Sequence, residues 1–210
     1  TYLGLELAHP LMPGASPLVD DLDMVRRLED AGASAIVMHS LFEEQISREA
    51  DRRRDHLEAH ADAFAEAASY LPEQGDFALG PDSYLEQIRR VRAAVGGPVI
   101  GSLNGTTPEG WLNYARLIEE AGARALELNF YYVATDPDES SDAVEDRLID
   151  IVRAVRHRVG IPIAVKLSPF FTSLPHLARR LVDAGASGLV LFNRFYQPDI
   201  DPEMLEAVPR

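Results

Sequence analysis

The sequence predicts an α/β fold, a (β/α)8 barrel of which about six βα units are present in the 210 residues. Short runs of valine, isoleucine, leucine and alanine alternate with amphipathic segments, which indicates parallel strands joined by helices. Polar residues follow almost every strand, and a barrel brings all of those strand ends to one face. An open doubly wound sheet, which would gather them at one switch point, is the less favoured closure.

Two internal repeats support the βα units. In the first repeat a helix ends in Ala-Gly-Ala ahead of an apolar strand, at 28–40, 118–130 and 181–193. The glycine of each copy suits the left-handed conformation just past a helix, where a side chain would clash. In the second repeat glycine and proline precede the strand, at 95–108 and 159–171.

Six apolar runs are predicted as strands, at 11–15, 35–39, 98–103, 125–129, 162–167 and 188–192. Apolar residues at helical spacing predict five helices, at 22–31, 82–95, 108–121, 142–159 and 174–184. Residues 1–210 are therefore predicted to form a single barrel domain.

Residues 43–80 interrupt this alternation after the second predicted strand. The segment is long, highly charged and helical in pattern, so we expect a helical insertion. It is either a solvated surface helix, or a lid or oligomer contact, because inserted barrel loops often carry function.

Composition and charge restrict the function. The net charge of −14 argues against binding to nucleic acid, which requires a basic surface. The absence of cysteine excludes disulfides, thiolate nucleophiles and zinc–sulfur sites. No apolar run is long enough to span a bilayer, and His56 and His60 alone are too few ligands for a zinc site. We expect a cytoplasmic protein that acts on a small molecule, without a metal, a membrane or a nucleic acid.

The predicted barrel mouth collects polar residues from the strand ends: Ser16, His39, Ser40, Asn104, Asn129, Tyr131, Tyr132, Lys166, Ser168, Asn193 and Arg194. Amides both donate and accept hydrogen bonds, so this set suits a planar ligand rich in heteroatoms. It contains no pair of carboxylates for glycoside hydrolysis. Glu127 lies within a strand, and the sequence leaves its direction open.

Lys166 places an ammonium at the end of an otherwise apolar strand. It could form a Schiff base with a carbonyl substrate. It could instead stabilise negative charge that develops on a cofactor ring. A third interpretation is a structural lysine that pairs with an acid at the end of the barrel.

Five motifs together resemble the dihydroorotate dehydrogenase family, and most closely its dihydroorotate dehydrogenase-like branch. In chain order they are "GASP", "SLNG", "ELNFYY", "VKLSPFF" and "LFNRF". Each motif alone is weak, but their combination and order are specific, and the resemblance runs from Thr1 to Arg210.

The resemblance implies a barrel that holds FMN at its mouth, and, by analogy, a homodimer. The residues it implies for contact with the flavin are Ala15, Ser16, Ser40, Asn104, Asn129 and Lys166. The amides it implies for the planar substrate are Asn104, Asn129 and Asn193. Lys166 would lie beside the pyrimidine edge of the flavin and stabilise the charge that arrives with a hydride.

The chain departs from the family pattern at three positions. Tyr132 stands where a cysteine or serine base is usual, Ala134 where an asparagine is usual, and His39 where a lysine is usual. A tyrosine, with a reference pKa of about 10, is a poor base at neutral pH and a better proton donor. We therefore expect Tyr131 or Tyr132 to protonate a substrate; the alternative is that both are packing or lid residues.

The expected function is an FMN-dependent oxidoreductase that transfers a hydride between flavin N5 and a small planar or unsaturated substrate. This function includes oxidation of dihydroorotate to orotate, although Tyr132 and Ala134 stand where the family has its usual base and an asparagine. The alternatives are a lyase or aldolase that uses Lys166 as a Schiff base, and a barrel without chemistry that serves as a binding module. Flavin barrels bind phosphate after strands seven and eight, so we expect the natural chain to continue beyond Arg210.

Overall fold

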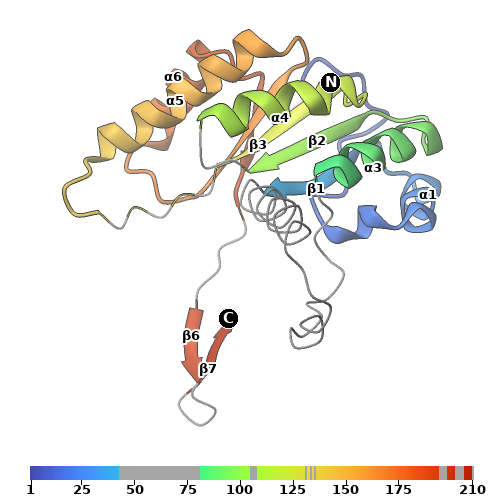
Figure 1. Cartoon of the computed structure of the whole chain (residues 1–210), viewed down its shortest axis with the longest axis horizontal. Helices are drawn as coiled ribbons and strands as arrows, with labels where there is room; N and C mark the ends of the chain where they lie inside the picture. The colour runs from blue at the N-terminus through green and yellow to red at the C-terminus, as the bar shows by residue number, and fades with distance from the viewer. Residues whose placement is uncertain are drawn as a thin grey trace, which may run out of the picture.

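One parallel sheet forms the centre of the computed structural model, which describes residues 1–42, 81–104, 108–130, 132, 134, 136–193, 198–201 and 206–209. The sheet has five strands: β1 (Ile36–Phe42), β2 (Val99–Asn104), β3 (Ala125–Asn129), β4 (Ile163–Leu167) and β5 (Gly188–Leu191). Their spatial order is the order of the chain, β1-β2-β3-β4-β5, and every neighbouring pair is parallel (Figure 1).

The helices that connect the strands are α3 (Pro81–Ala94), α4 (Pro108–Glu120), α5 (Ser141–Arg158) and α6 (Leu174–Asp183), while η1 (Pro17–Asp20) and α1 (Leu22–Asp30) precede β1. Right-handed crossovers between strands that follow chain order place every connecting helix on the same face of the sheet. A doubly wound sheet would reverse direction at its switch point. The strand order therefore confirms the prediction of part of a (β/α)8 barrel.

The predicted helices and the last five predicted strands are confirmed, with small differences at their ends. The glycines of the first repeat adopt the predicted left-handed conformation, with φ of 95° at Gly32, 103° at Gly122 and 107° at Gly185. The insertion predicted at 43–80 lies outside the described residues.

The prediction of a strand at 11–15 is wrong, because the segment has no strand conformation. The carbonyl of Leu11 accepts hydrogen bonds from the backbone N–H and the hydroxyl of Ser34, which precedes β1, at 3.1 and 2.7 Å. Pro10 and Pro13 have no N–H group to donate to a strand ladder. The apolar character of the segment serves packing instead, since Met12 packs against the sheet.

A second sheet of two antiparallel strands, β6 (Pro198–Asp201) and β7 (Glu206–Pro209), follows β5. No sequence pattern used above predicts it. Among the described residues, no helix is both long enough and apolar enough to cross a membrane.

The two faces of the parallel sheet carry different cores. The outer face packs against the helices through Ile36, Val99, Leu126 and Ile163 in a large apolar cluster. The inner face carries a smaller cluster of Leu3, Ala35, Val37, Ile100, Ala125 and Ala164.

The N-terminal segment covers the lower part of the inner face. Tyr2, Leu5 and Leu7 pack against the inner cluster. A Cβ atom at Gly188 would lie 2.8 Å from Cδ2 of Leu3, so the absence of a side chain there lets Leu3 approach the sheet. Beyond this apolar cluster, toward the carboxyl ends of the strands, the inner face carries polar residues.

Candidate functional site

Six polar residues form two layers on the inner face near the carboxyl ends of the strands; we call them the inner-face polar patch. The lower layer contains Ser40, Ser102 and Glu127, and the upper layer contains Asn104, Asn129 and Lys166. Ser40 pairs with Ser102, Ser102 with Glu127, and Asn129 with Lys166 in the strand register. Register partners and residues two positions apart in a strand share a face. The sheet therefore gathers these side chains from four adjacent strands.

A β-bulge in β1 brings Ser40 into the patch. Between Val37 and Ser40, the two residues Met38 and His39 stand opposite one residue of β2, Gly101. The extra residue changes the alternation of the strand, so Ser40 shares the inner face with Val37. Its hydroxyl lies 2.8 Å from the hydroxyl of Ser102.

Tyr84 of α3 supports the bulge from the outer face. Its side chain is fully buried, and its hydroxyl oxygen accepts a hydrogen bond from the backbone N–H of Ser102 at 3.1 Å. The same hydroxyl lies 2.9 Å from the carbonyl of Ser102 and 3.0 Å from that of His39, and it can donate to one of them. Burial raises the pKa of Tyr84, so this donor keeps its proton.

His39 faces the helices rather than the mouth. Its Nδ1 lies 2.6 Å from Oδ1 of Asp20 in η1, although the two atoms lack the alignment of a hydrogen bond. Its ring meets the ring of Tyr84 edge-on, with centroids 5.0 Å apart. The expectation that His39 joins the polar set at the mouth is therefore wrong, because the bulge turns it to the outer face.

Lys166 and Glu127 form an ion pair within the patch. The Nζ of Lys166 lies 3.3 Å from Oε1 of Glu127, and their side chains are 17% and 8% exposed. Glu127 thus points to the inner face, which the sequence leaves open. Its charge is also felt at Tyr2, whose pKa is raised first by burial and then by Glu127. Of the three interpretations of Lys166 offered by the sequence, a lysine that pairs with an acid describes its contact with Glu127.

Asn129 has a free acceptor in the patch. Its Nδ2 lies 3.4 Å from the hydroxyl of Ser40, but its Oδ1 is buried and has no hydrogen-bond partner among the described residues. Asn104 ends the neighbouring strand β2, one step beyond the Leu103–Leu128 register pair. A ligand that offers an N–H group would satisfy Oδ1 of Asn129.

Asn193 holds the ends of three strands together. Its Nδ2 donates to the carbonyl of Phe130 at 3.3 Å, and its backbone N–H donates to the carbonyl of Leu167 at 2.7 Å. The backbone N–H of Phe130 in turn donates to the carbonyl of Lys166 at 3.0 Å. The structure therefore gives the amide of Asn193 a role in fixing the rim.

Among the described residues, neither Ala15 nor Ser16 makes a hydrogen bond to the patch. Ala15 packs against the inner cluster, and Ser16 directly precedes η1. Tyr131 and Arg194 lie outside the described residues. The hydroxyl of Ser168 caps its own loop by accepting from the backbone N–H of Phe170 at 3.1 Å.

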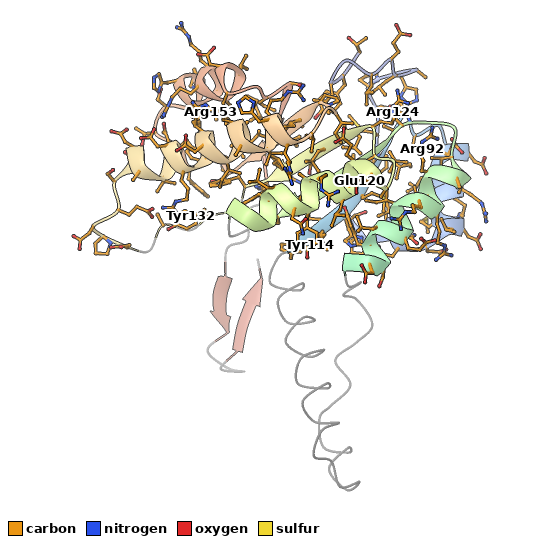
Figure 2. The ribbon with its side chains drawn as sticks, turned by 45° about the horizontal axis from the view of Figure 1, so that its top comes forward. Arg92, Tyr114, Glu120, Arg124, Tyr132 and Arg153 are labelled. Atoms are coloured by element: carbon orange, nitrogen blue, oxygen red, sulfur yellow. The ribbon has the colours of Figure 1, made fainter. Side chains whose placement is uncertain are left out.

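Tyr132 belongs to a separate cluster at the start of the loop after β3 (Figure 2). Its hydroxyl donates to Oε2 of Glu139 at 2.7 Å, and the guanidinium of Arg147 lies 4.7 Å from the centre of its ring. Arg147 also pairs with Glu139. The structure does not bring Tyr132 into contact with Asn129 or Lys166.

Sequence reasoning missed Ser102 and the cluster of Asp20, His39 and Tyr84. Ser102 could have been found from the two-residue period of β2, because it lies two positions before Asn104. The Asp20 cluster had no sequence signal, since it depends on the bulge.

No family model matches the chain. It is 26% identical over 218 aligned positions to "Dihydroorotate dehydrogenase B (NAD(+)), catalytic subunit" of Thermoplasma acidophilum, which covers 96% of this chain and 64% of that protein. It is 25% identical over 203 positions to "NAD-dependent dihydropyrimidine dehydrogenase subunit PreA" of Escherichia coli K12, covering 92% of this chain and 47% of that protein.

These similarities, over most of the chain, confirm the resemblance to dihydroorotate dehydrogenase-like proteins. The chain spans less than two thirds of the length of these relatives. Among solved structures, a phosphoenolpyruvate phosphomutase of Streptomyces platensis subsp. rosaceus matches with a TM-score of 0.53 at 18% identity, over 89% of this chain and 56% of that one. That match concerns the fold alone.

Proposed function

We propose that this dihydroorotate dehydrogenase-like chain forms the flavin-facing part of an oxidoreductase that acts on a carbon–carbon bond of a small planar substrate. The proposal rests on the similarity to two kinds of pyrimidine-directed dehydrogenase subunit and on the inner-face polar patch. The proposed cofactor is FMN, which would supply hydride transfer when bound.

The observation that carries the proposal is that an acceptor free to bind a ligand, Oδ1 of Asn129, lies on the strand next to the ammonium of Lys166. Oδ1 of Asn129 is buried without a partner in the described part of the chain, and Lys166 is its register neighbour on β4. Flavins and pyrimidines both present N–H and carbonyl groups along the edge of a flat ring. Such an edge would donate to Asn129 and accept from Lys166, so the residues present fit the proposed cofactor.

Several residues of the patch have distinct parts in this proposal. Lys166 would stabilise negative charge on the ring, and Glu127 holds the ammonium in place beneath it. Ser40 orients the amide of Asn129, since its hydroxyl lies 3.4 Å from Nδ2. Asn104, on the next strand, would contribute a second amide to the cofactor or the substrate.

The proton donor is proposed to be Tyr131 or Tyr132, on the loop that follows Asn129. Tyr132 reaches the substrate only if its hydroxyl leaves Glu139, to which it donates in this structure. Replacing each tyrosine with phenylalanine in turn tests the assignment. Unchanged turnover in both variants would show that neither residue supplies the proton.

A Schiff base at Lys166 is a weaker proposal, because a Schiff base requires a neutral amine. Forming it would also break the ion pair that Lys166 makes with Glu127. Borohydride trapping of a carbonyl substrate on Lys166 would support the Schiff base and contradict the flavin proposal.

The direct test is titration of the full-length protein with FMN, followed by visible absorption. We expect Asn129→Ala to weaken binding by about tenfold, which corresponds to ~1.4 kcal/mol for one lost hydrogen bond and its desolvated neighbours. Asn113→Ala, on the exposed side of α4, is the matched control and should bind like the unaltered protein. A protein that binds no FMN under any condition would refute the proposal.

A further inference from the structure

We propose that Asp20, His39 and Tyr84 are positioning residues for the inner-face polar patch, although they contact the sheet from its outer face. Together they hold the β-bulge of β1 in the form that turns Ser40 toward the patch. The proposal rests on the proposed function only for the identity of the ligand, because the contacts that carry it are all within the chain.

Asp20 is fixed beside the bulge from two directions. It ends η1, and its Oδ1 lies 2.6 Å from Nδ1 of His39. Gln87 of α3 is 3% exposed, and its Nε2 donates to the carbonyls of Val19 and Asp20 at 2.8 and 3.0 Å. The position of Asp20 is therefore set by α3 as well as by η1.

Tyr84 ties the bulge to the neighbouring strand β2. Its hydroxyl lies 3.0 Å from the carbonyl of His39, and it accepts from the backbone N–H of Ser102 at 3.1 Å. Its ring also meets the ring of His39 edge-on. A bulge leaves one residue of the ladder unpaired, so the hydroxyl of Tyr84 provides a partner that the interrupted ladder does not.

On the inner face, the bulge determines where Ser40 points. The hydroxyl of Ser40 lies 2.8 Å from that of Ser102 and 3.4 Å from Nδ2 of Asn129. In a regular ladder His39 would take the inner position and Ser40 would turn outward, because side chains alternate along a strand. Asn129 would then lose its partner, and an imidazole would enter the patch. The outer-face contacts of the bulge oppose this change.

The first test compares variants of the full-length protein in titrations with FMN. Asp20→Ala removes the carboxylate beside His39 and should weaken FMN binding about fivefold. Asp20→Asn keeps an oxygen at the same place, so its affinity should stay within about twofold of that of the unaltered protein. Unchanged affinity in Asp20→Ala would overturn the proposal.

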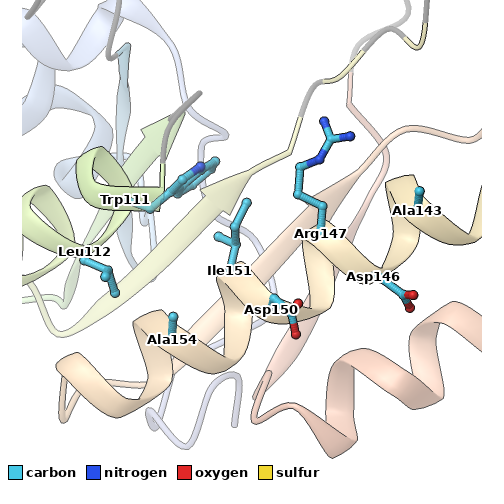
Figure 3. Close-up of a pocket in the computed structure, with 8 residues that line it drawn as sticks. All are labelled: Trp111, Leu112, Ala143, Asp146, Arg147, Asp150, Ile151 and Ala154. Atoms are coloured by element: carbon cyan, nitrogen blue, oxygen red, sulfur yellow. The ribbon is translucent and has the colours of Figure 1, made fainter. Parts of the chain in front are cut away.

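A double-variant cycle shows whether Asp20 acts through Ser40. Ser40→Ala should also weaken FMN binding, and adding Asp20→Ala to it should cause no further loss. Additive losses would overturn the proposal, because Asp20 would then affect binding by another route. Ile151→Val is the control for a general loss of stability and should bind FMN like the unaltered protein. It shortens a buried side chain on the part of α5 that faces Trp111 of α4 (Figure 3).

A measurement without flavin separates this proposal from the proposed function. The side-chain amide of Asn129 gives a pair of signals in a ¹H–¹⁵N spectrum, which Asn129→Ala identifies. Asp20→Ala and Ser40→Ala should both shift this pair in the flavin-free protein, and Ile151→Val should not. Signals that stay in place in Asp20→Ala would overturn the positioning role even if FMN binds. The expected shifts in a protein that binds no FMN would support the positioning role and refute the flavin proposal alone.

Discussion

Lys166 on β4 reaches down to Glu127 on β3, with 3.3 Å between Nζ and Oε1. Glu127 lies one layer below Asn129, the register partner of Lys166. The pair therefore fixes the charge of Lys166 beside Asn129, whose Oδ1 has no hydrogen-bond partner among the described residues. Glu127 holds the ammonium from below, on the inner face of the sheet. The upper layer of the patch is therefore open to a ligand.

Glu127→Gln should destabilise the fold by ~1–3 kcal/mol, because it leaves a mostly buried ammonium without its counter-charge. The amide can still accept a hydrogen bond, which keeps the loss below that of full removal. The measurement is urea-induced unfolding. Glu120→Gln, which breaks the exposed pair with Arg116 on α4, is the control and should cost less than ~0.5 kcal/mol. Equal losses in the free energy of unfolding for Glu127→Gln and Glu120→Gln would contradict a stabilising role of the buried pair.

Tyr84→Phe should cost ~1–3 kcal/mol, because it leaves the backbone N–H of Ser102 and the carbonyls at the bulge without the hydroxyl. Tyr132→Phe also removes a hydroxyl, but at a side chain that is 41% exposed. We expect its cost to be smaller. A loss for Tyr84→Phe as small as that for Tyr132→Phe would show that the bulge does not need Tyr84.

The same tyrosine gives a pH dependence with a defined sign. Burial raises the pKa of Tyr84 in the folded state above its ordinary value of 10.0. Above that value the unfolded chain loses the proton while the folded chain keeps it, so stability falls as the pH rises. Between about pH 9 and pH 11 the unaltered protein should lose more stability than Tyr84→Phe. Parallel pH profiles would contradict this account.

Gly185→Ala should be more destabilising than Gly122→Ala, although both glycines have positive φ. A Cβ atom at Gly185 would lie 2.6 Å from Cγ of Arg156, whereas one at Gly122 would lie 3.6 Å from Cγ of Arg92. Arg156 cannot move freely, because its Nη1 donates to the carbonyl of Ile161 at 2.9 Å. We expect Gly122→Ala to lower the free energy of unfolding by ~1–2 kcal/mol through the backbone conformation alone. Gly185→Ala should lower it further, as measured by thermal or urea unfolding. Equal losses would indicate that Arg156 adapts.

The βα units of the barrel were predictable because the spacing of apolar residues and the glycines at helix ends indicate the same helices and strands along most of the chain. The left-handed glycines mark helix ends, and apolar runs mark strands buried on both faces. The segment at 11–15 has the same apolar character but fails as a strand, since Pro10 and Pro13 cannot donate to a ladder. Composition alone did not separate these two cases.

The candidate site was only partly predictable, because its residues meet through register rather than through spacing in the chain. Asn129 and Lys166 were expected at strand ends, and the register places them side by side. The bulge moved Ser40 inward and His39 outward, and a single extra residue in a ladder leaves no mark in the sequence. The direction of Glu127 likewise required the sheet.

The measurement that tests the central claim most directly is the reduction potential of FMN bound to the full-length protein, compared with that of Lys166→Met. If Lys166 stabilises negative charge on the ring, its removal should lower the potential by about 30 mV or more, which is ~1.4 kcal/mol for a two-electron couple. Lys166→Arg, which keeps the charge, should retain most of the potential. An unchanged potential in Lys166→Met, or a protein that holds no FMN, would contradict the assignment of the inner-face polar patch as a flavin site.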